Sequence, residues 1–244
     1  MGFKEVLEAA SGGDPNSQNA LGYMYYEGNG VEKDLGRAFI WFDLSARQGD
    51  PEGQCNAGFM LAHGYGANTN FEEAFDLYRM SAEQGYVRAQ FNLANAYSDG
   101  IGTKQNWDEA MKWYAKAADN GSLVAHYRIG VMNEEGRGTP RDEAAAAAIF
   151  RECADAGHSK AAVRLARMLM DGRGADKDPN AAAKLCVGAA EDGNADAMAI
   201  LGKMSLSGEG MMKSRTNAVK WLKKAKARGN EEAGTLLESV NNWF

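Results

Sequence analysis

Histidine, cysteine and serine are the residues through which this chain could catalyse a reaction or bind a metal. Its three histidines are His63, His126 and His158, and none forms a recognisable metal-ligand motif with a neighbouring cysteine or carboxylate. No Ser-His-Asp or Cys-His set stands out by local context, and no S-x-x-K motif followed by K-T-G occurs. We therefore predict no catalytic residue, no metal site and no cofactor, and a protein that is not an enzyme.

Six pairs of glycines, each separated by one residue, could suggest a loop that binds phosphate. A dinucleotide-binding fingerprint has one such loop, placed between a strand and a helix. These pairs recur after stretches of helical periodicity, so they predict helix C-terminal caps followed by turns. The pairs are Gly28/Gly30, Gly64/Gly66, Gly100/Gly102, Gly136/Gly138, Gly172/Gly174 and Gly208/Gly210.

The cysteines indicate a reducing compartment. There are three, Cys55, Cys153 and Cys186, and an odd number without regular spacing argues against a disulfide framework.

The N-terminal stretch MGFKEVLEAASGG has no apolar core long enough for a signal peptide or a membrane span. We predict a cytoplasmic protein without an integral membrane segment. The alternative is a periplasmic or exported protein whose upstream signal segment has been removed.

Charge is unevenly distributed along the chain. The net charge is −6 overall, but residues 1–122 carry 9 basic and 17 acidic groups, whereas residues 195–244 carry 8 and 5. The basic excess gathers at Lys220, Lys223, Lys224, Lys226 and Arg228. We interpret this cluster as a solvated helix face. A patch that binds nucleic acid or an anionic membrane is the weaker alternative, because the whole chain is acidic and such binding depends on neutralising phosphates.

A period of 36 residues runs through the whole chain. One glycine series shows it without insertion or deletion: Gly13, Gly49, Gly85, Gly121, Gly157, Gly193 and Gly229. A methionine row keeps the same spacing, and core packing or an adaptable binding surface could explain it: Met24, Met60, Met132, Met168 and Met204. A fixed period of this length is typical of a solenoid, in which each repeat packs only on its neighbours.

Each repeat is predicted to be a helix, a turn and a second helix. In residues 87–122, one apolar face at helical spacing precedes Gly100 and another precedes Gly121. A residue able to cap free amides marks the start of every second helix: Asp34, Asn70, Asn106, Asp142, Asp178 and Ser214. Glu73 and Glu109 follow their caps by three residues, so we expect capping boxes there.

The motif A-x-x-x-L-G-x-x-Y-x-x-G-x-G, followed by A-x-x-W-Y-x-x-A-A-x-x-G, resembles the Sel-one-like repeat, a relative of the tetratricopeptide repeat. The resemblance implies an all-α, right-handed α/α superhelix, a solenoid of 36-residue helix-turn-helix repeats. We predict an N-terminal capping helix in residues 1–14, six repeats in residues 15–230 and a C-terminal capping helix in residues 231–244. The resemblance also implies that the first helix of each repeat lines a concave groove, and that the protein is a non-catalytic adaptor.

Two rows of first-helix residues lie off the apolar core face and are predicted to point into this groove. One row is Asn19, Cys55, Phe91, Tyr127, Val163 and Ala199; the other is Tyr23, Phe59, Asn95, Val131, Arg167 and Lys203. The aromatic members could instead pack sideways on the next repeat. The residues predicted to bind a partner are Asn19, Tyr23, Phe59, Phe91, Asn95, Tyr127, Arg167 and Lys203.

The function predicted from these features is a scaffold or adaptor that holds a protein or peptide segment in its groove, with a bacterial regulatory or assembly role and no nucleic-acid partner. An enzyme or small-ligand binder is one alternative, and a carbohydrate-binding protein of the cell envelope is another. The sequence leaves the partner, the pathway and the oligomeric state open.

Overall fold

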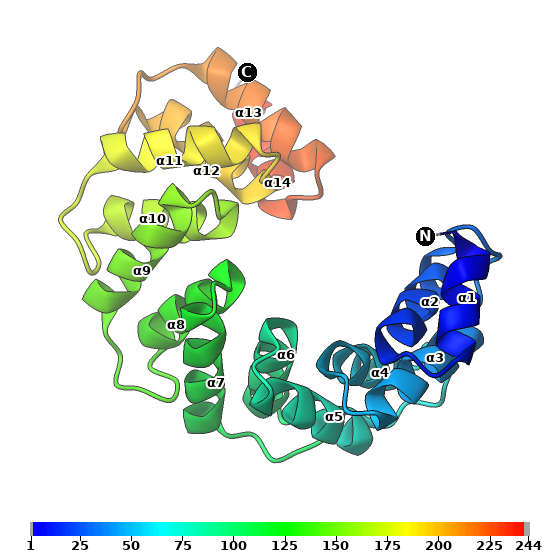
Figure 1. The fold of residues 1–244 in the computed structure, drawn as a ribbon. Helices are drawn as coiled ribbons and strands as arrows, with labels where there is room; N and C mark the ends of the chain where they lie inside the picture. The colour runs from blue at the N-terminus through cyan, green and yellow to red at the C-terminus, as the bar shows by residue number, and fades with distance from the viewer. Residues whose placement is uncertain (1, 242–244) are drawn as a thin grey trace. The chain divides into compact units, whose positions relative to one another are not determined.

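The computed structural model describes residues 2–241, which form α-helices joined by short loops and contain no strand (Figure 1). The helices of the described residues follow one another in chain order: α1 (Phe3–Ser11), α2 (Pro15–Glu27), α3 (Leu35–Arg47), α4 (Pro51–His63), α5 (Phe71–Glu83), α6 (Val87–Asp99), α7 (Trp107–Asp119), α8 (Leu123–Glu135), α9 (Glu143–Asp155), α10 (Ser159–Asp171), α11 (Pro179–Glu191), α12 (Ala195–Ser207), α13 (Arg215–Ala227) and α14 (Glu231–Asn241). The prediction of an all-α solenoid with two helices per repeat is confirmed.

The second helices begin where the capping residues predict. Asp34 accepts a hydrogen bond from the backbone N–H of Arg37, and the other five predicted caps make the equivalent contact. The expected capping boxes differ in detail. The Glu73 carboxylate accepts from the side-chain amide of Asn70, and the Glu109 carboxylate pairs with Lys112. Each glutamate therefore bonds a nearby side chain in place of the free backbone N–H that a box would satisfy.

The glycine pairs end the first helices and allow neighbouring repeats to approach closely. Gly64 closes α4 in the left-handed conformation, with φ of 66°. Gly66 also has positive φ, and a Cβ placed on it would lie 2.0 Å from the carbonyl oxygen of Leu35, at the start of the preceding second helix. Gly174 meets Glu143 in the same way in a later repeat. The pairs thus have a structural explanation, because only glycine fits both the conformation and the contact.

Small residues let the two helices of a repeat pack closely. The alanine that recurs in every second helix is buried in each repeat: Ala38, Ala74, Ala110, Ala146, Ala182 and Ala218. Some first helices carry a glycine where they meet the second helix of their repeat. A Cβ on Gly22 of α2 would lie 2.6 Å from the Phe42 ring, and a Cβ on Gly202 of α12 would lie 2.6 Å from the Leu222 side chain. The methionine row is largely part of this core, since Met60, Met132, Met168 and Met204 are buried.

The chain divides into two compact units, residues 1–125 and residues 126–244, and the boundary falls within α8. Unit 1 carries 9 Lys and Arg against 17 Asp and Glu, a net charge of −8. Unit 2 carries 18 against 16, a net charge of +2. The same fold therefore presents different electrostatic surfaces in its two halves.

Candidate functional site

One face of each first helix carries the side chains that the helix pair does not bury. These side chains lie at the second, sixth, ninth and thirteenth positions of the helix, a spacing that places them on one side. We call this surface the first-helix face. In unit 1 it is formed by α2, α4 and α6, and in unit 2 by α10, α12 and α8 from His126 onward.

The first predicted row lies at the fifth helical position, which is next to this face but turned between neighbouring first helices. Asn19 and Cys55 are buried there, as are Val163 and Ala199, while Phe91 and Tyr127 are half-buried. The aromatic members contact the second helix of their own repeat, because the Phe91 ring lies 5.8 Å from that of Tyr114 and the Tyr127 ring 5.7 Å from that of Phe150. This row therefore packs between helices, but these two ring contacts lie within a repeat, whereas the alternative predicted from the sequence was packing on the next repeat.

A recurring polar contact explains why the fifth position is turned inward. In three places, the sixth residue of one first helix donates a hydrogen bond to the fifth residue of the first helix before it. Asn56 donates to the Asn19 side-chain oxygen at 2.8 Å. Asn92 contacts the Cys55 sulfur at 3.7 Å, and Arg164 donates to the Tyr127 hydroxyl at 3.2 Å. These contacts link successive repeats.

The second predicted row lies at the ninth position and does belong to the first-helix face. Its unit 1 members, Tyr23, Phe59 and Asn95, are half-buried; Val131 is buried, and Arg167 and Lys203 are exposed. The Tyr23 hydroxyl donates to Asn56 and accepts from Arg88, and Asn95 accepts from the Tyr114 hydroxyl.

Lys203 is held by Glu232 at 2.5 Å, whereas Arg167 has no hydrogen bond or ion pair with any described residue. Of the two cations in this row, only Arg167 is therefore available to a partner without breaking an internal contact.

Sequence reasoning overlooked the second and sixth positions of the face. Lys160 and Arg164 of α10 occupy them, together with Arg88 and Asn92 of α6. A stricter use of helical geometry would have found them, because residues three, four and seven apart share a face with the ninth position. The polar contacts between repeats had no signal at the sequence level, since their partners are 37 residues apart and differ in type from repeat to repeat.

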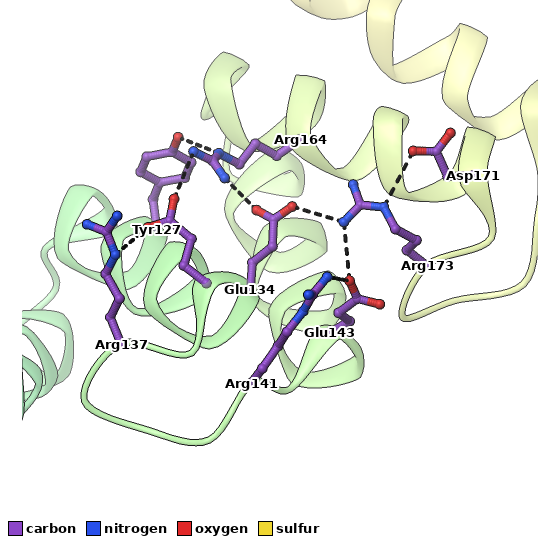
Figure 2. Close-up of polar contacts among 9 residues, drawn as sticks. Tyr127, Glu134, Arg137, Arg141, Glu143, Arg164, Asp171 and Arg173 are labelled. Atoms are coloured by element: carbon purple, nitrogen blue, oxygen red, sulfur yellow. Dashed lines mark hydrogen bonds and ion pairs between the residues drawn. The ribbon is translucent and has the colours of Figure 1, made fainter.

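A network of alternating charges surrounds Arg164 in unit 2 (Figure 2). Glu134, at the C-terminal end of α8, accepts from Arg164 at 2.5 Å and from Arg173 at 3.4 Å. Arg173 also reaches Glu143 at 3.3 Å. Burial lowers the pKa of Arg164, but its hydrogen bonds to Glu134 and Tyr127 raise that pKa, and the net shift is upward. Arg164 is thus a fixed cation whose position is set by two partners.

A cavity of about 390 Å³ opens beside this network. Lys160, Arg164 and Arg167 of α10 line it, together with the ring of Tyr127 and the first turn of α12. Val163 forms an apolar part of its wall. Lys160 and Arg167 are exposed and make no hydrogen bond or ion pair with a described residue. The cavity therefore combines one fixed cation, two available cations and a small apolar surface.

Unit 1 carries an aromatic group in place of this cavity. The Phe59 and His63 rings lie 4.2 Å apart at the end of α4, and Tyr65 in the following loop lies 5.9 Å from Phe59. A smaller cavity of about 150 Å³ adjoins them, lined by Phe71, Ile101 and other residues of α4, α5 and α6. The first-helix face of unit 1 is therefore aromatic and amide-rich.

The thiols lie away from these surfaces. Cys55, Cys153 and Cys186 are all buried, and none of them is in a disulfide. Burial raises the pKa of Cys55 and of Cys186 to about 12, and that of Cys153 to about 11.

Residues 2–241 hold no group of three or more His, Cys, Asp or Glu side chains placed to bind a metal ion. Every helix in that range falls short of the length and hydrophobicity that a bilayer span requires.

Comparison with solved structures finds close relatives of this fold. A Sel1 repeat protein from Oxalobacter formigenes is 32% identical, with a TM-score of 0.80 over 87% of this chain and 85% of that one. The c5321 protein, a protective antigen with an SLR fold from uropathogenic Escherichia coli, is 26% identical, with a TM-score of 0.78. That match covers all of this chain but 60% of the other, so this chain spans about three-fifths of its length. The immunity protein Pa5087 from Pseudomonas aeruginosa shares the fold at 20% identity, with a TM-score of 0.51 over 75% of this chain and 67% of that one.

No curated protein matches the chain. The family model described as Sel1 repeat matches it six times in succession, at residues 15–50, 51–86, 87–122, 123–158, 159–194 and 195–230. These matches cover most of the chain and leave no residue between one repeat and the next. The chain therefore belongs to the Sel1 repeat family.

Proposed function

We propose that this protein is a non-catalytic adaptor that holds a protein or peptide segment on its first-helix face. Sel1 repeats form a scaffold fold that commonly mediates protein interactions. The observation that carries the proposal is the set of side chains on this face that packing does not use. Lys160 and Arg167 beside an open cavity are the clearest example, because they are exposed and have no internal partner.

Binding is favoured over catalysis by what lines the cavity. Its ionisable residues are three cations, Asp196 and Tyr127, and no nucleophile lies beside a base. Asp196 accepts a hydrogen bond from Asn230 at 2.8 Å, and Tyr127 accepts one from Arg164. An enzyme site commonly gathers groups that can exchange protons with a substrate. A surface with one fixed cation and two available cations is better suited to recognising an anionic group.

The adaptor is proposed to act in the cytoplasm. Three buried cysteines outside disulfides support this location, because oxidising compartments favour paired cysteines in small stable domains.

Site-specific cross-linking tests which face a partner contacts. A photo-reactive amino acid would replace Ala20 in unit 1 or Arg128 in unit 2, both of which are exposed at the sixth helical position. Matched controls carry it at Met80 and Val187, which are exposed on the second helices α5 and α11. After irradiation in an extract of the native organism, we expect the same partner to be linked from Ala20 or Arg128 and not from the controls. Equal labelling from the second-helix positions would contradict the proposal.

A further inference from the structure

We propose that the cavity on α10 is a subsite for carboxylate side chains, and that the segment it binds is an acidic stretch of a partner polypeptide. This inference rests on the proposed adaptor function and specifies the chemistry of one part of its surface. We call the cavity, with Lys160, Arg164 and Arg167, the basic pocket.

The three cations line one side of a single helix. Lys160 precedes Arg164 by four residues, and Arg167 follows it by three, so all three share a face of α10. The rise from the first to the last is about 10 Å, since a helix advances about 1.5 Å per residue. Successive outward side chains of an extended peptide lie about 7 Å apart, so two carboxylates on one peptide edge could each reach a cation.

The three cations are not equally available. Arg164 is 32% exposed and is already bound by Glu134 and Tyr127, so its role is to position the wall of the pocket. Lys160 and Arg167 are exposed and unpaired among the described residues. Asp196, in the first turn of α12, is the only acidic side chain lining the pocket, and it accepts a hydrogen bond from Asn230. Lys160 and Arg167 contribute two positive charges and Asp196 one negative charge, because Asn230 is neutral, so the pocket keeps a net positive charge for a ligand.

The fold does not require these cations. At the position of Lys160, the other first helices carry Asn16, Glu52, Arg88, Val124 and Asp196; at the position of Arg167, they carry Tyr23, Phe59, Asn95, Val131 and Lys203. No other first helix combines two unpaired cations at these positions, because Arg88 bonds Tyr23 and Lys203 bonds Glu232. The pairing at α10 is thus a local property of this repeat.

A peptide suits the pocket better than a nucleic acid does. Unit 2 has a net charge of only +2, and Glu135 and Asp171 are exposed on the same first-helix face. These carboxylates interrupt any continuous track of positive charge, which nucleic-acid binding needs because many phosphates must be neutralised, whereas a short acidic segment needs only the pocket. Val163 and the Tyr127 ring offer apolar contact to the methylene groups of a glutamate side chain.

The test is a titration of the whole protein with a short fluorescein-labelled peptide in which Glu alternates with Ala and Ser, followed by fluorescence anisotropy. The matched peptide has Gln in place of every Glu. The test variant is Lys160→Glu with Arg167→Glu. The control variant is Lys220→Glu with Lys223→Glu, the same change of charge at exposed lysines of α13. Circular dichroism and thermal melts verify that both variants fold.

We expect the Glu peptide to bind the wild type and the control variant alike, and the test variant about 10-fold more weakly or worse. Binding should weaken between about 0.1 M and 1 M salt, because the Debye length falls from about 10 Å to about 3 Å. Equal affinity for the Glu and Gln peptides would overturn the proposal. So would pocket-dependent binding of single-stranded DNA in the absence of peptide binding.

The outcome is separable from that of the adaptor proposal. If the Glu peptide fails to bind while Ala20 and Arg128 still cross-link a partner, the carboxylate subsite is wrong and the adaptor function stands. If neither face position links a partner and the Glu peptide binds the pocket, the subsite stands and the adaptor function is wrong.

Discussion

The two units join their neighbouring first helices through different polar side chains. At the fifth and sixth positions of unit 1, first helices are joined by neutral groups, such as the Asn56 amide bonded to Asn19. In unit 2, the Arg164 guanidinium makes the equivalent contact by donating to the Tyr127 hydroxyl, and it also donates to the Glu134 carboxylate. The comparison shows that the side chains at the fifth and sixth positions need only form a hydrogen bond with each other. Their chemistry is therefore free to vary, and it determines the character of the adjacent face.

A second contrast concerns the fourth position of the first helices. Unit 1 has Gln18, Gln54 and Gln90 there, and Gln48 donates to Gln18 at 2.7 Å within the first repeat. In unit 2 the same position holds His126, which lies 3.5 Å from Glu152, and then Ala162 and Met198, which are buried apolar side chains. The glutamine at this position is thus confined to the first helices of unit 1.

The largest expected effect tests what the two units share. Leu93→Ala in unit 1 and Leu165→Ala in unit 2 each remove a buried side chain from the same helical position. Each should lower the free energy of unfolding by about 2–5 kcal/mol, through lost burial and a cavity. Chemical denaturation measures both. A loss of stability confined to one unit would break the view that the cores are equivalent.

The second prediction uses the close approach of glycine to a neighbouring helix. Gly66→Ala and Gly174→Ala should each destabilise by about 2–4 kcal/mol, because the Cβ would lie 2.0 Å from a carbonyl oxygen and φ is positive. Gly188→Ala is the control: this helical glycine has open space around it, so the change should be neutral or stabilise by up to about 1 kcal/mol. A tolerated alanine at Gly66 would contradict the packing described.

The third prediction separates neutral from charged links. Asn56→Ala leaves the buried Asn19 amide without its partner and should cost about 1–3 kcal/mol at any salt concentration. Arg164→Ala removes a partly exposed ion pair and should cost about 1 kcal/mol, less at high salt. Urea unfolding at two concentrations of NaCl measures both. An equal salt dependence would remove the distinction between the units.

The fourth prediction concerns pH and only unit 2. The His158 Nδ1 atom accepts a hydrogen bond from the backbone N–H of Ala161, so the ring must be unprotonated at that atom. Burial, followed by the charge of Lys160, lowers the pKa of His158 below its ordinary value. Because the folded-state pKa lies below the unfolded one, this stabilisation is present above about pH 6.5 and is lost as the pH falls further.

Melts of the wild type and of His158→Asn between about pH 7.5 and pH 5.5 check this expectation. Asparagine can cap the helix and does not titrate, so the variant should lose less stability over that range. Identical pH profiles would show that His158 does not contribute to the loss.

The smallest expected effect concerns the thiols. Reductant should leave the melting temperature unchanged, because none of the three cysteines is in a disulfide. Reaction with a thiol reagent at neutral pH should be slow in the folded state, since burial raises each thiol pKa to about 11 or 12. A drop of many degrees on reduction would contradict the free-thiol assignment.

The sequence predicted part of the candidate site. Arg167 was identified correctly as an exposed cation on a first helix, because the ninth position follows from helical spacing alone. Asn19 and Phe91 were expected on the same surface, but the fifth position lies about 40° from the ninth and is covered by the neighbouring helices. So small a rotation cannot be read from a repeat pattern, because it depends on how closely adjacent first helices pack.

The sequence by itself determined the period, the two helices of each repeat and their ends. Those features follow from local chemistry: capping side chains such as Asp34, glycines that adopt positive φ, and apolar residues at helical spacing. Only the tertiary structure decided which surface side chains remain available. Lys203 is bound to Glu232 and Arg167 is not, although both occupy the same position of their repeats. The reason is that a side chain's availability depends on neighbours from other repeats, which lie far away in the sequence and are brought close only by folding.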